Sequence, residues 1–160
     1  MKNKIVITLS WLMVLVTMII IFSFSDQSAK KSTVVSEGVV VQILDVVMDK
    51  EDITPPVVKK FHTPIRKIAH FGVYMLLGFC MINAFDKSFK IKTYLNAILS
   101  ASACALYAVT DEIHQNFSED RGPSAIDVLI DTGGAIFGII LFISFMAIFN
   151  RIMLKKSRNC

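Results

Sequence analysis

The sequence has few charged residues and few cysteines. Asp, Glu, Lys and Arg make up 19% of the 160 residues, whereas a soluble domain contains about 25%. Three cysteines are too few for a disulfide scaffold, and no pair falls outside the apolar segments, so we expect no disulfide. Apolar residues make up 54% of the chain, which excludes a disordered protein. The length allows one domain or a small bundle of membrane helices.

The apolar residues are concentrated in four runs, at residues 5–24, 68–85, 94–110 and 126–149. A membrane-spanning helix needs roughly 17–25 such residues. Four buried helices of a soluble protein are the alternative, but these runs leave little amphipathic surface to face water. The apolar region of a signal peptide has about 7–15 residues and is followed by a cleavage site of small residues. The first run is longer and lacks such a site, which argues against a cleaved signal peptide. The sequence therefore predicts an all-α polytopic membrane protein, a single domain over residues 1–160 with four transmembrane helices.

Lysine and arginine predict how the chain crosses the membrane. They are concentrated at the N-terminus, in the 86–93 loop and in the C-terminal tail, and basic loops stay in the cytoplasm. Both termini are therefore predicted to be cytoplasmic and the 111–125 connection to lie outside. The 25–67 connection is an exception, because it should lie outside yet carries seven Lys and Arg residues. Because most of the other basic residues set orientation, the net charge of +4 does not indicate a nucleic-acid partner.

The connection between the first two runs contains a further amphipathic segment at residues 34–48. Its valine and isoleucine residues recur at helical spacing, which favours an interfacial helix lying on the outer leaflet. A packed helix of a small external domain is the other interpretation. Pro55 and Pro56 then separate this segment from the second run.

Polar residues gather at the predicted outer ends of the last three runs. A buried Asp costs about 2.5–3.5 kcal/mol at the membrane centre and less near the ends, so the acids here need partners. Taken alone, Lys67 could extend its ammonium group to the lipid headgroups, and Asp127 could cap a helix, without any shared pocket. Three helices that supply ionisable groups at one depth instead predict a polar pocket at the outer face. Its residues are Arg66, Lys67, His70, Tyr74, Asp111, Glu112, His114, Gln115, Arg121, Asp127 and Asp131.

Several uses of this pocket are open. His and carboxylate side chains suit Zn or Mn, although no spacing here is diagnostic of a metal site. Arg121, Asp127 and Asp131 are spaced like the Arg-x5-His-x3-Asp of phosphatidic acid phosphatases, with Asp127 in place of the nucleophilic His. The candidate catalytic residues or metal ligands are His70, Asp111, Glu112, His114, Asp127 and Asp131. Binding of a phosphate or carboxylate without catalysis would use Ser25, Gln27, Arg66, Lys67, His70, Tyr74, Gln115 and Arg121.

Glycines follow the acids of the fourth run. Gly134 and Gly138 form a small-xxx-small pattern, which lets two membrane helices approach closely. We predict that the fourth helix uses it to pack against another helix of the same chain.

The sequence resembles the VanZ-like family in motifs that run from the first into the fourth apolar segment, with residues 25–65 matching least. The motifs are Phe24-Ser25-x-Gln27, Arg66-Lys67-x-x-His70-Phe71-x-x-Tyr74-x-x-x-Gly78, Asp111-Glu112-x-His114-Gln115-x-Phe117-x-x-x-Arg121 and Asp127-x-x-x-Asp131-x-x-Gly134. The resemblance implies a small multi-pass protein of the bacterial cytoplasmic membrane. The family's namesake is linked to low-level resistance to the glycopeptide teicoplanin. The resemblance implies no known reaction.

Two functions are therefore compatible with the sequence. The first is a non-catalytic protein of the cell envelope that binds an envelope lipid, a lipid-linked wall precursor or a glycopeptide antibiotic. The second is a membrane enzyme, a metal-assisted, phosphoryl-transfer or acyl-transfer hydrolase or transferase, that modifies an envelope lipid or a peptidoglycan intermediate. A divalent metal is the cofactor that the second function would use.

Overall fold

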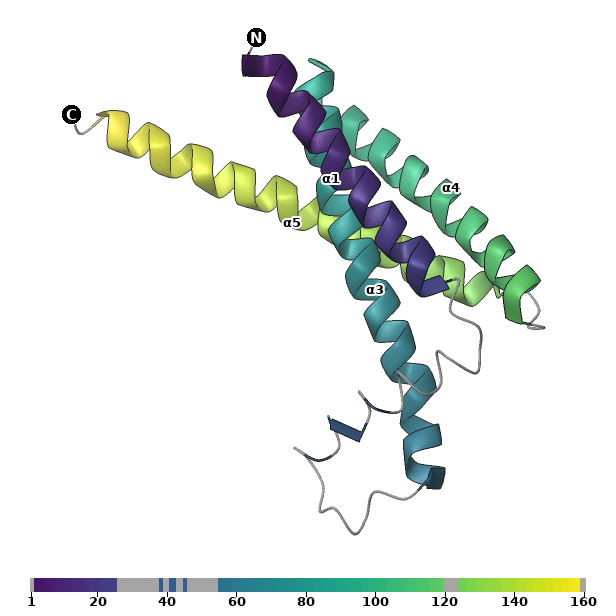
Figure 1. The fold of residues 1–160 in the computed structure, drawn as a ribbon. Coiled ribbons are helices and arrows are strands. Elements are labelled where there is room, and N and C mark those ends of the chain that lie inside the picture. Colours follow the sequence, from purple (N-terminus) through teal and green to yellow (C-terminus); the bar gives the residue numbers. More distant parts are fainter. Residues whose placement is uncertain are drawn as a thin grey trace.

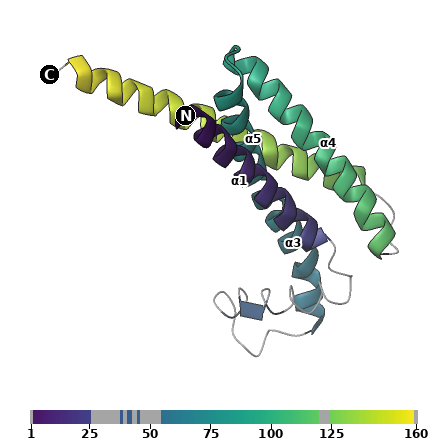
Figure 2. The same ribbon diagram turned by 45° about the horizontal axis from the view of Figure 1, so that its top comes forward.

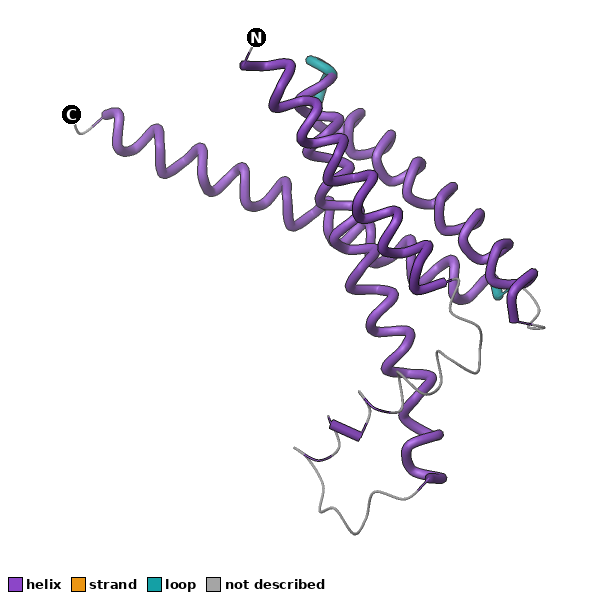
Figure 3. The backbone as a smooth tube through the Cα atoms, viewed as in Figure 1, coloured by secondary structure: helices purple, strands orange, loops and turns teal. Residues whose placement is uncertain are grey.

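The computed structural model describes residues 2–25, 55–119 and 124–158, together with residues 38, 41, 42 and 45. It contains four long helices, α1 (Lys2–Ser25), α3 (Pro55–Ser88), α4 (Thr93–Glu119) and α5 (Ala125–Arg158) (Figure 1). The described residues include no strand (Figure 3). Each long helix contains a segment long and apolar enough to cross a membrane. The predicted all-α architecture with four transmembrane helices is therefore confirmed.

Most of the predicted interfacial helix, residues 34–48, lies outside the described residues. The four described positions within it, residues 38, 41, 42 and 45, are helical. The helix itself stays a prediction.

The helices extend beyond the apolar runs of the sequence. α3 begins at Pro55, well before the run at 68–85, and carries Pro64 in its interior. Pro55 stands in the first turn of the helix, where a proline is tolerated because its missing N–H would have no intrahelical partner. Hydropathy locates the apolar part of a helix, whereas backbone hydrogen bonding continues into its polar ends.

The helices expose apolar side chains on their outward faces. Leu12 and Ile19 on α1 and Ile140 on α5 are each about half exposed, and similar residues cover the rest of the surface. Soluble proteins rarely expose apolar patches of this extent. This surface is suited to contact with lipid chains.

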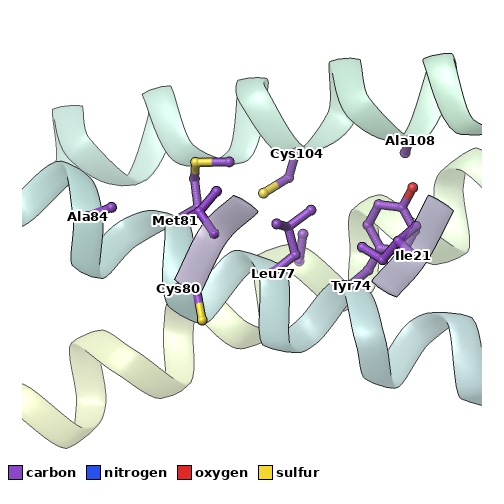
Figure 4. Packing of buried hydrophobic residues seen from close by; sticks show 10 residues of the cluster. Ile21, Tyr74, Leu77, Cys80, Met81, Ala84, Cys104 and Ala108 are labelled. Carbon is purple, nitrogen blue, oxygen red and sulfur yellow. The ribbon is translucent and has the colours of Figure 1, made fainter. Parts of the chain in front are cut away.

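α3 is the central helix, because it packs against each of the other three and most extensively against α5. A large buried cluster (Figure 4) includes Ile21, Tyr74, Leu77, Cys80, Met81, Ala84, Cys104 and Ala108. A smaller one between α3 and α5 consists of Ile82, Ile139 and Phe142. Cys80 and Cys104 are buried free thiols within the large cluster.

Glycines bring α5 into close contact with α3. A Cβ atom at Gly134 would collide with the backbone carbonyl of Phe71, and one at Gly138 with that of Met75. Only residues without a side chain allow the two backbones to approach this closely. The predicted use of the glycine pattern, close helix packing within the chain, is confirmed.

The helices alternate in direction, so the two ends of the bundle differ. Both termini and the α3–α4 connection lie toward one end (Figures 1 and 2). At the other end, which we call the site end, α1 and α4 finish and α5 begins. The first turns of α3 extend past the site end, and the second half of α5 extends away from the other helices.

Candidate functional site

Three buried carboxylates mark the site end of the bundle. Asp111 and Glu112 near the end of α4 are 4% and 9% exposed, and Asp131 near the start of α5 is 5% exposed. A carboxylate taken out of water is stable only when it is paired, hydrogen-bonded or protonated. The groups around these three acids therefore decide what each of them does.

Asp111 and Asp131 converge on one histidine. One ligand atom from each of His70 on α3, Asp111 on α4 and Asp131 on α5 lies within 4.8 Å of the other two. His70 Nδ1 is 3.9 Å from Asp131 Oδ2, which is beyond hydrogen-bonding distance. We refer to these residues as the three-residue centre.

Asp111 is held in place mainly through one of its two oxygens. Gln115, one turn further along α4, donates from Nε2 to Asp111 Oδ2 at 3.2 Å and to Ser25 Oγ at 3.0 Å. Ser25 is the last residue of α1 and is fully buried, so this amide joins α1 to the centre. The other oxygen, Asp111 Oδ1, is buried and makes no hydrogen bond of acceptable geometry with a described residue.

Tyr74 lies one turn further along α3 than His70. Its side chain is fully buried, and its hydroxyl points toward α4 (Figure 4). The hydroxyl is close enough to Asp111 and Asp131 to be affected by their charge. Within the described part of the chain it nevertheless has no partner in hydrogen-bonding geometry. A buried hydroxyl that interacts with Asp111 without full hydrogen-bonding geometry thus faces the three-residue centre.

Tyr107 is a residue of this region that the sequence analysis did not identify. Its ring lies 6.3 Å from that of Tyr74, and its hydroxyl donates to the backbone carbonyl of Met18 on α1 at 2.8 Å. The sequence could have indicated Tyr107, because it lies four residues before Asp111 and this spacing places both side chains on one face of α4.

An ion pair borders the centre between α3 and α5. Lys67 Nζ lies 2.6 Å from Asp127 Oδ1, with the two side chains 33% and 19% exposed. Arg66 is half-buried beside it. A charged group that Lys67 contacts must therefore compete with the carboxylate of Asp127.

Glu112 and His114 lie outside the three-residue centre. Glu112 Oε1 accepts a hydrogen bond from the backbone N–H of Ser124 at 2.7 Å. Ser124 Oγ in turn accepts from the backbone N–H of Asp127 at 3.3 Å, an N-cap at the start of α5. His114 stacks on Phe22 of α1, with ring centroids 4.6 Å apart. Glu112 thus positions α5, and His114 packs α4 on α1.

The structure brings together six of the predicted site residues and separates others from them. The residues brought together are Ser25, His70, Tyr74, Asp111, Gln115 and Asp131. Lys67 and Asp127 form the bordering ion pair. Gln27 and Arg121 lie outside the described residues, so their predicted roles stay predictions.

The chemistry available at the centre follows from its charge. Two carboxylates this close cannot both stay ionised in a poorly solvated site unless a cation or a proton lies between them. Imidazole and carboxylate are also the groups that most often transfer protons in enzymes. The centre is therefore equipped to bind a cation or to move protons.

The comparisons with known proteins identify the family. A search of curated proteins and a search of solved structures each gave no match. The family model described as VanZ/LLP1 matches residues 10–149, a range that includes the three-residue centre and the glycines of the α3–α5 crossing. With four helices that are able to span a membrane, the chain belongs to the VanZ/LLP1 family of membrane proteins.

Proposed function

We propose that the protein binds the charged headgroup of a lipid-borne ligand at its site end. The observation that carries this proposal is the convergence of polar and charged side chains from all four helices on one end of a bundle whose outer surface is largely apolar. The ligand's apolar chains would lie along the exposed Leu and Ile side chains of the helices. The cell-envelope molecules with this chemistry are an anionic envelope lipid, a lipid-linked wall precursor and a lipid-bearing glycopeptide such as teicoplanin.

The ion pair between Lys67 and Asp127 is the proposed entry point. Lys67 is the more exposed partner, and a phosphate or carboxylate on the ligand forms strong charge-assisted hydrogen bonds with an ammonium group. Binding would transfer Lys67 from Asp127 to the ligand. Asp127 would then lie beside the ligand's remaining polar groups.

A lipid-binding measurement tests this proposal. The variant replaces both partners, Lys67→Gln with Asp127→Asn, so that no lone charge is left half-buried. The matched control is Lys87→Gln, because Lys87 is exposed in the last turn of the same helix at the opposite end. A hydrogen bond to a charged group contributes about 1.5–3 kcal/mol, so we expect roughly 10- to 100-fold weaker binding of phosphatidylglycerol in mixed nanodiscs by the double variant.

The same variants separate the three ligands. Parallel measurements use phosphatidylglycerol, an undecaprenyl-pyrophosphate-linked precursor and teicoplanin, together with teicoplanin susceptibility of cells that express each variant. Equal binding by the wild type and the double variant for all three ligands would contradict the proposal. Equal losses in the Lys87→Gln control would show that bulk charge, not the site, governs binding.

A membrane enzyme is the second candidate, and the contact of His70 with Asp131 favours it. His70 is partly exposed and has a buried carboxylate 3.9 Å from Nδ1, so a slight approach on ligand binding would form the hydrogen bond through which a carboxylate orients a histidine for proton transfer. The test is a mass profile of envelope lipids and wall precursors in a deletion strain complemented with the wild type or with His70→Ala. A species that accumulates in both the deletion strain and the His70→Ala strain would support catalysis, and unchanged profiles would contradict it.

A further inference from the structure

We propose that His70, Asp111 and Asp131 bind one divalent transition-metal cation of the Zn²⁺ or Mn²⁺ type. The inference is independent of the proposed lipid-binding function, which concerns the ion pair of Lys67 and Asp127. It rests on the geometry of the centre, on its charge and on two buried polar atoms that are incompletely hydrogen-bonded.

The spacing of the three side chains suits a shared ion. Zinc lies about 2.0–2.2 Å from His nitrogen and carboxylate oxygen, so two ligand atoms on one zinc are about 3–4 Å apart. His70 Nδ1 and Asp131 Oδ2, at 3.9 Å, already have such a separation. Asp111 supplies the third ligand atom within 4.8 Å of both, so the three side chains would have to draw slightly closer around the ion.

The charge of the centre favours a divalent cation, because a protonated His70 would supply only one positive charge for two carboxylates. Asp111 and Asp131 are 4% and 5% exposed, and two ionised carboxylates so close together repel each other strongly in a site without solvent. The nearby ammonium of Lys67 is paired with Asp127 instead. A divalent ion neutralises both carboxylates at once.

Two buried atoms at the centre are incompletely hydrogen-bonded. Asp111 Oδ1 and the Tyr74 hydroxyl are near neighbours that interact with each other, but not in full hydrogen-bonding geometry. An unsatisfied buried polar group costs about 1–3 kcal/mol, and more when it is charged. Coordination of Asp111 Oδ1 by a metal would remove this cost, and a metal-bound water would give the Tyr74 hydroxyl a partner.

The surroundings of Asp111 resemble those of a metal ligand. Ligating side chains are usually fixed by a hydrogen bond to their second polar atom, and Gln115 fixes Asp111 in this way through Oδ2. Three protein ligands leave further coordination positions for water or an external ligand. The imidazole nitrogen favours Zn²⁺ or Mn²⁺ over Mg²⁺ and Ca²⁺, which prefer oxygen ligands.

The test measures metal in the full-length protein. The protein is purified in detergent through a tag without histidine, stripped with a chelator, incubated with Zn²⁺ or Mn²⁺, desalted and examined by inductively coupled plasma mass spectrometry. We expect about one ion per wild-type chain, and a loss of most of it in His70→Ala and in Asp131→Asn. Glu112→Gln is the matched control, because Glu112 is a buried carboxylate at the same end outside the centre, and it should retain the ion.

Two results would overturn the proposal. One is the absence of bound metal in the folded wild type, which would leave shared protons as the means of neutralising the acids. The other is equal metal content in the wild type and both variants. If the variants fail to fold, electron paramagnetic resonance of the Mn²⁺-loaded wild type decides, because imidazole ligation gives a nitrogen coupling that carboxylates alone do not give.

Discussion

A single amide determines how the central carboxylate is presented. Gln115 uses its amide NH2 group to donate to both Asp111 and Ser25, so the end of α1 and the last turns of α4 are joined to the three-residue centre. Its effect on the centre is indirect, because it fixes the orientation of Asp111 and leaves Oδ1 directed elsewhere. Gln115 is therefore a positioning residue.

The first prediction concerns this positioning role. Loss of a hydrogen bond to a metal ligand typically weakens metal affinity about 10- to 100-fold, and we expect a loss of this size for Gln115→Ala. Competition with a chromophoric chelator measures the affinity. The control is Asn83→Ala, because Asn83 is an amide that donates to Ser10 at the opposite end of the bundle. An equal loss in this control, or no loss in Gln115→Ala, would contradict the positioning role.

Residue spacing predicted part of the site. Positions four apart correctly placed His70 with Tyr74 and Asp111 with Gln115 on shared helix faces. Spacing did not distinguish Asp111 from Glu112, because adjacent helical residues point about 100° apart and either could face the centre. The packing of α4 against α3 and α5 determines that Asp111, and not Glu112, faces the centre. The rotation of α4 about its axis in this packing cannot be read from a single sequence.

At the level of elements, α5 is held at its start and in its middle. Ser124 caps its first turn and is bound by Glu112 of α4. Further along, Gly134 and Gly138 press against the backbone of α3. Together these contacts fix where Asp131, between them, meets His70.

The second prediction tests the α3–α5 crossing. In Gly138→Ala the new methyl group meets the backbone carbonyl of Met75, which cannot rotate away as a side chain could, so the helices must separate. Overpacking of this kind costs about 1–3 kcal/mol, and we expect a lower melting temperature in detergent. The fluorescence of Trp11, the single tryptophan, provides the measurement.

The control for this prediction is Gly133→Ala on the same helix. A Cβ at Gly133 meets no atom within 4 Å, and alanine is about 1 kcal/mol more favourable than glycine inside a helix. We expect Gly133→Ala to leave the melting temperature unchanged or to raise it. The same decrease in both variants would mean that glycine flexibility, not close approach, is required.

The third prediction tests the cap. Replacement of an N-cap serine by alanine costs about 0.5–2 kcal/mol, so Ser124→Ala should lower the melting temperature, although Glu112 still binds the backbone N–H of residue 124. Ser144→Ala is the control, because Ser144 is exposed in the middle of α5. Equal melting temperatures of the two variants would contradict the capping role.

Hydropathy predicted the elements well and their ends less well. It found all four membrane segments, because about 20 consecutive apolar residues have few other uses. It missed the early turns of α3, which are polar and contain Pro64. The glycine pattern predicted a close crossing for α5, but the partner helix, α3, depends on how the four helices are arranged and not on α5 alone.

The whole molecule combines an apolar exterior with buried acids that, among the described residues, all lie at one end. The alternation of helix directions places both termini and the α3–α4 connection opposite the site end (Figure 1). Because the predicted cytoplasmic segments are the termini and the 86–93 loop, the described arrangement agrees with four crossings. Which side of the membrane the site end faces is a separate prediction, derived from the basic residues.

The fourth prediction tests this orientation by cysteine labelling. In a variant that lacks Cys80, Cys104 and Cys160, a cysteine is introduced by Glu119→Cys at the end of α4 or by Lys90→Cys in the α3–α4 connection. Because basic loops stay in the cytoplasm, we expect a membrane-impermeant maleimide to label position 119 in intact cells and position 90 only after permeabilisation. The reverse pattern would place the site end in the cytoplasm and would exclude external antibiotics as its ligands. Labelling of both positions in intact cells would contradict four crossings, since the positions lie at opposite ends of one spanning helix.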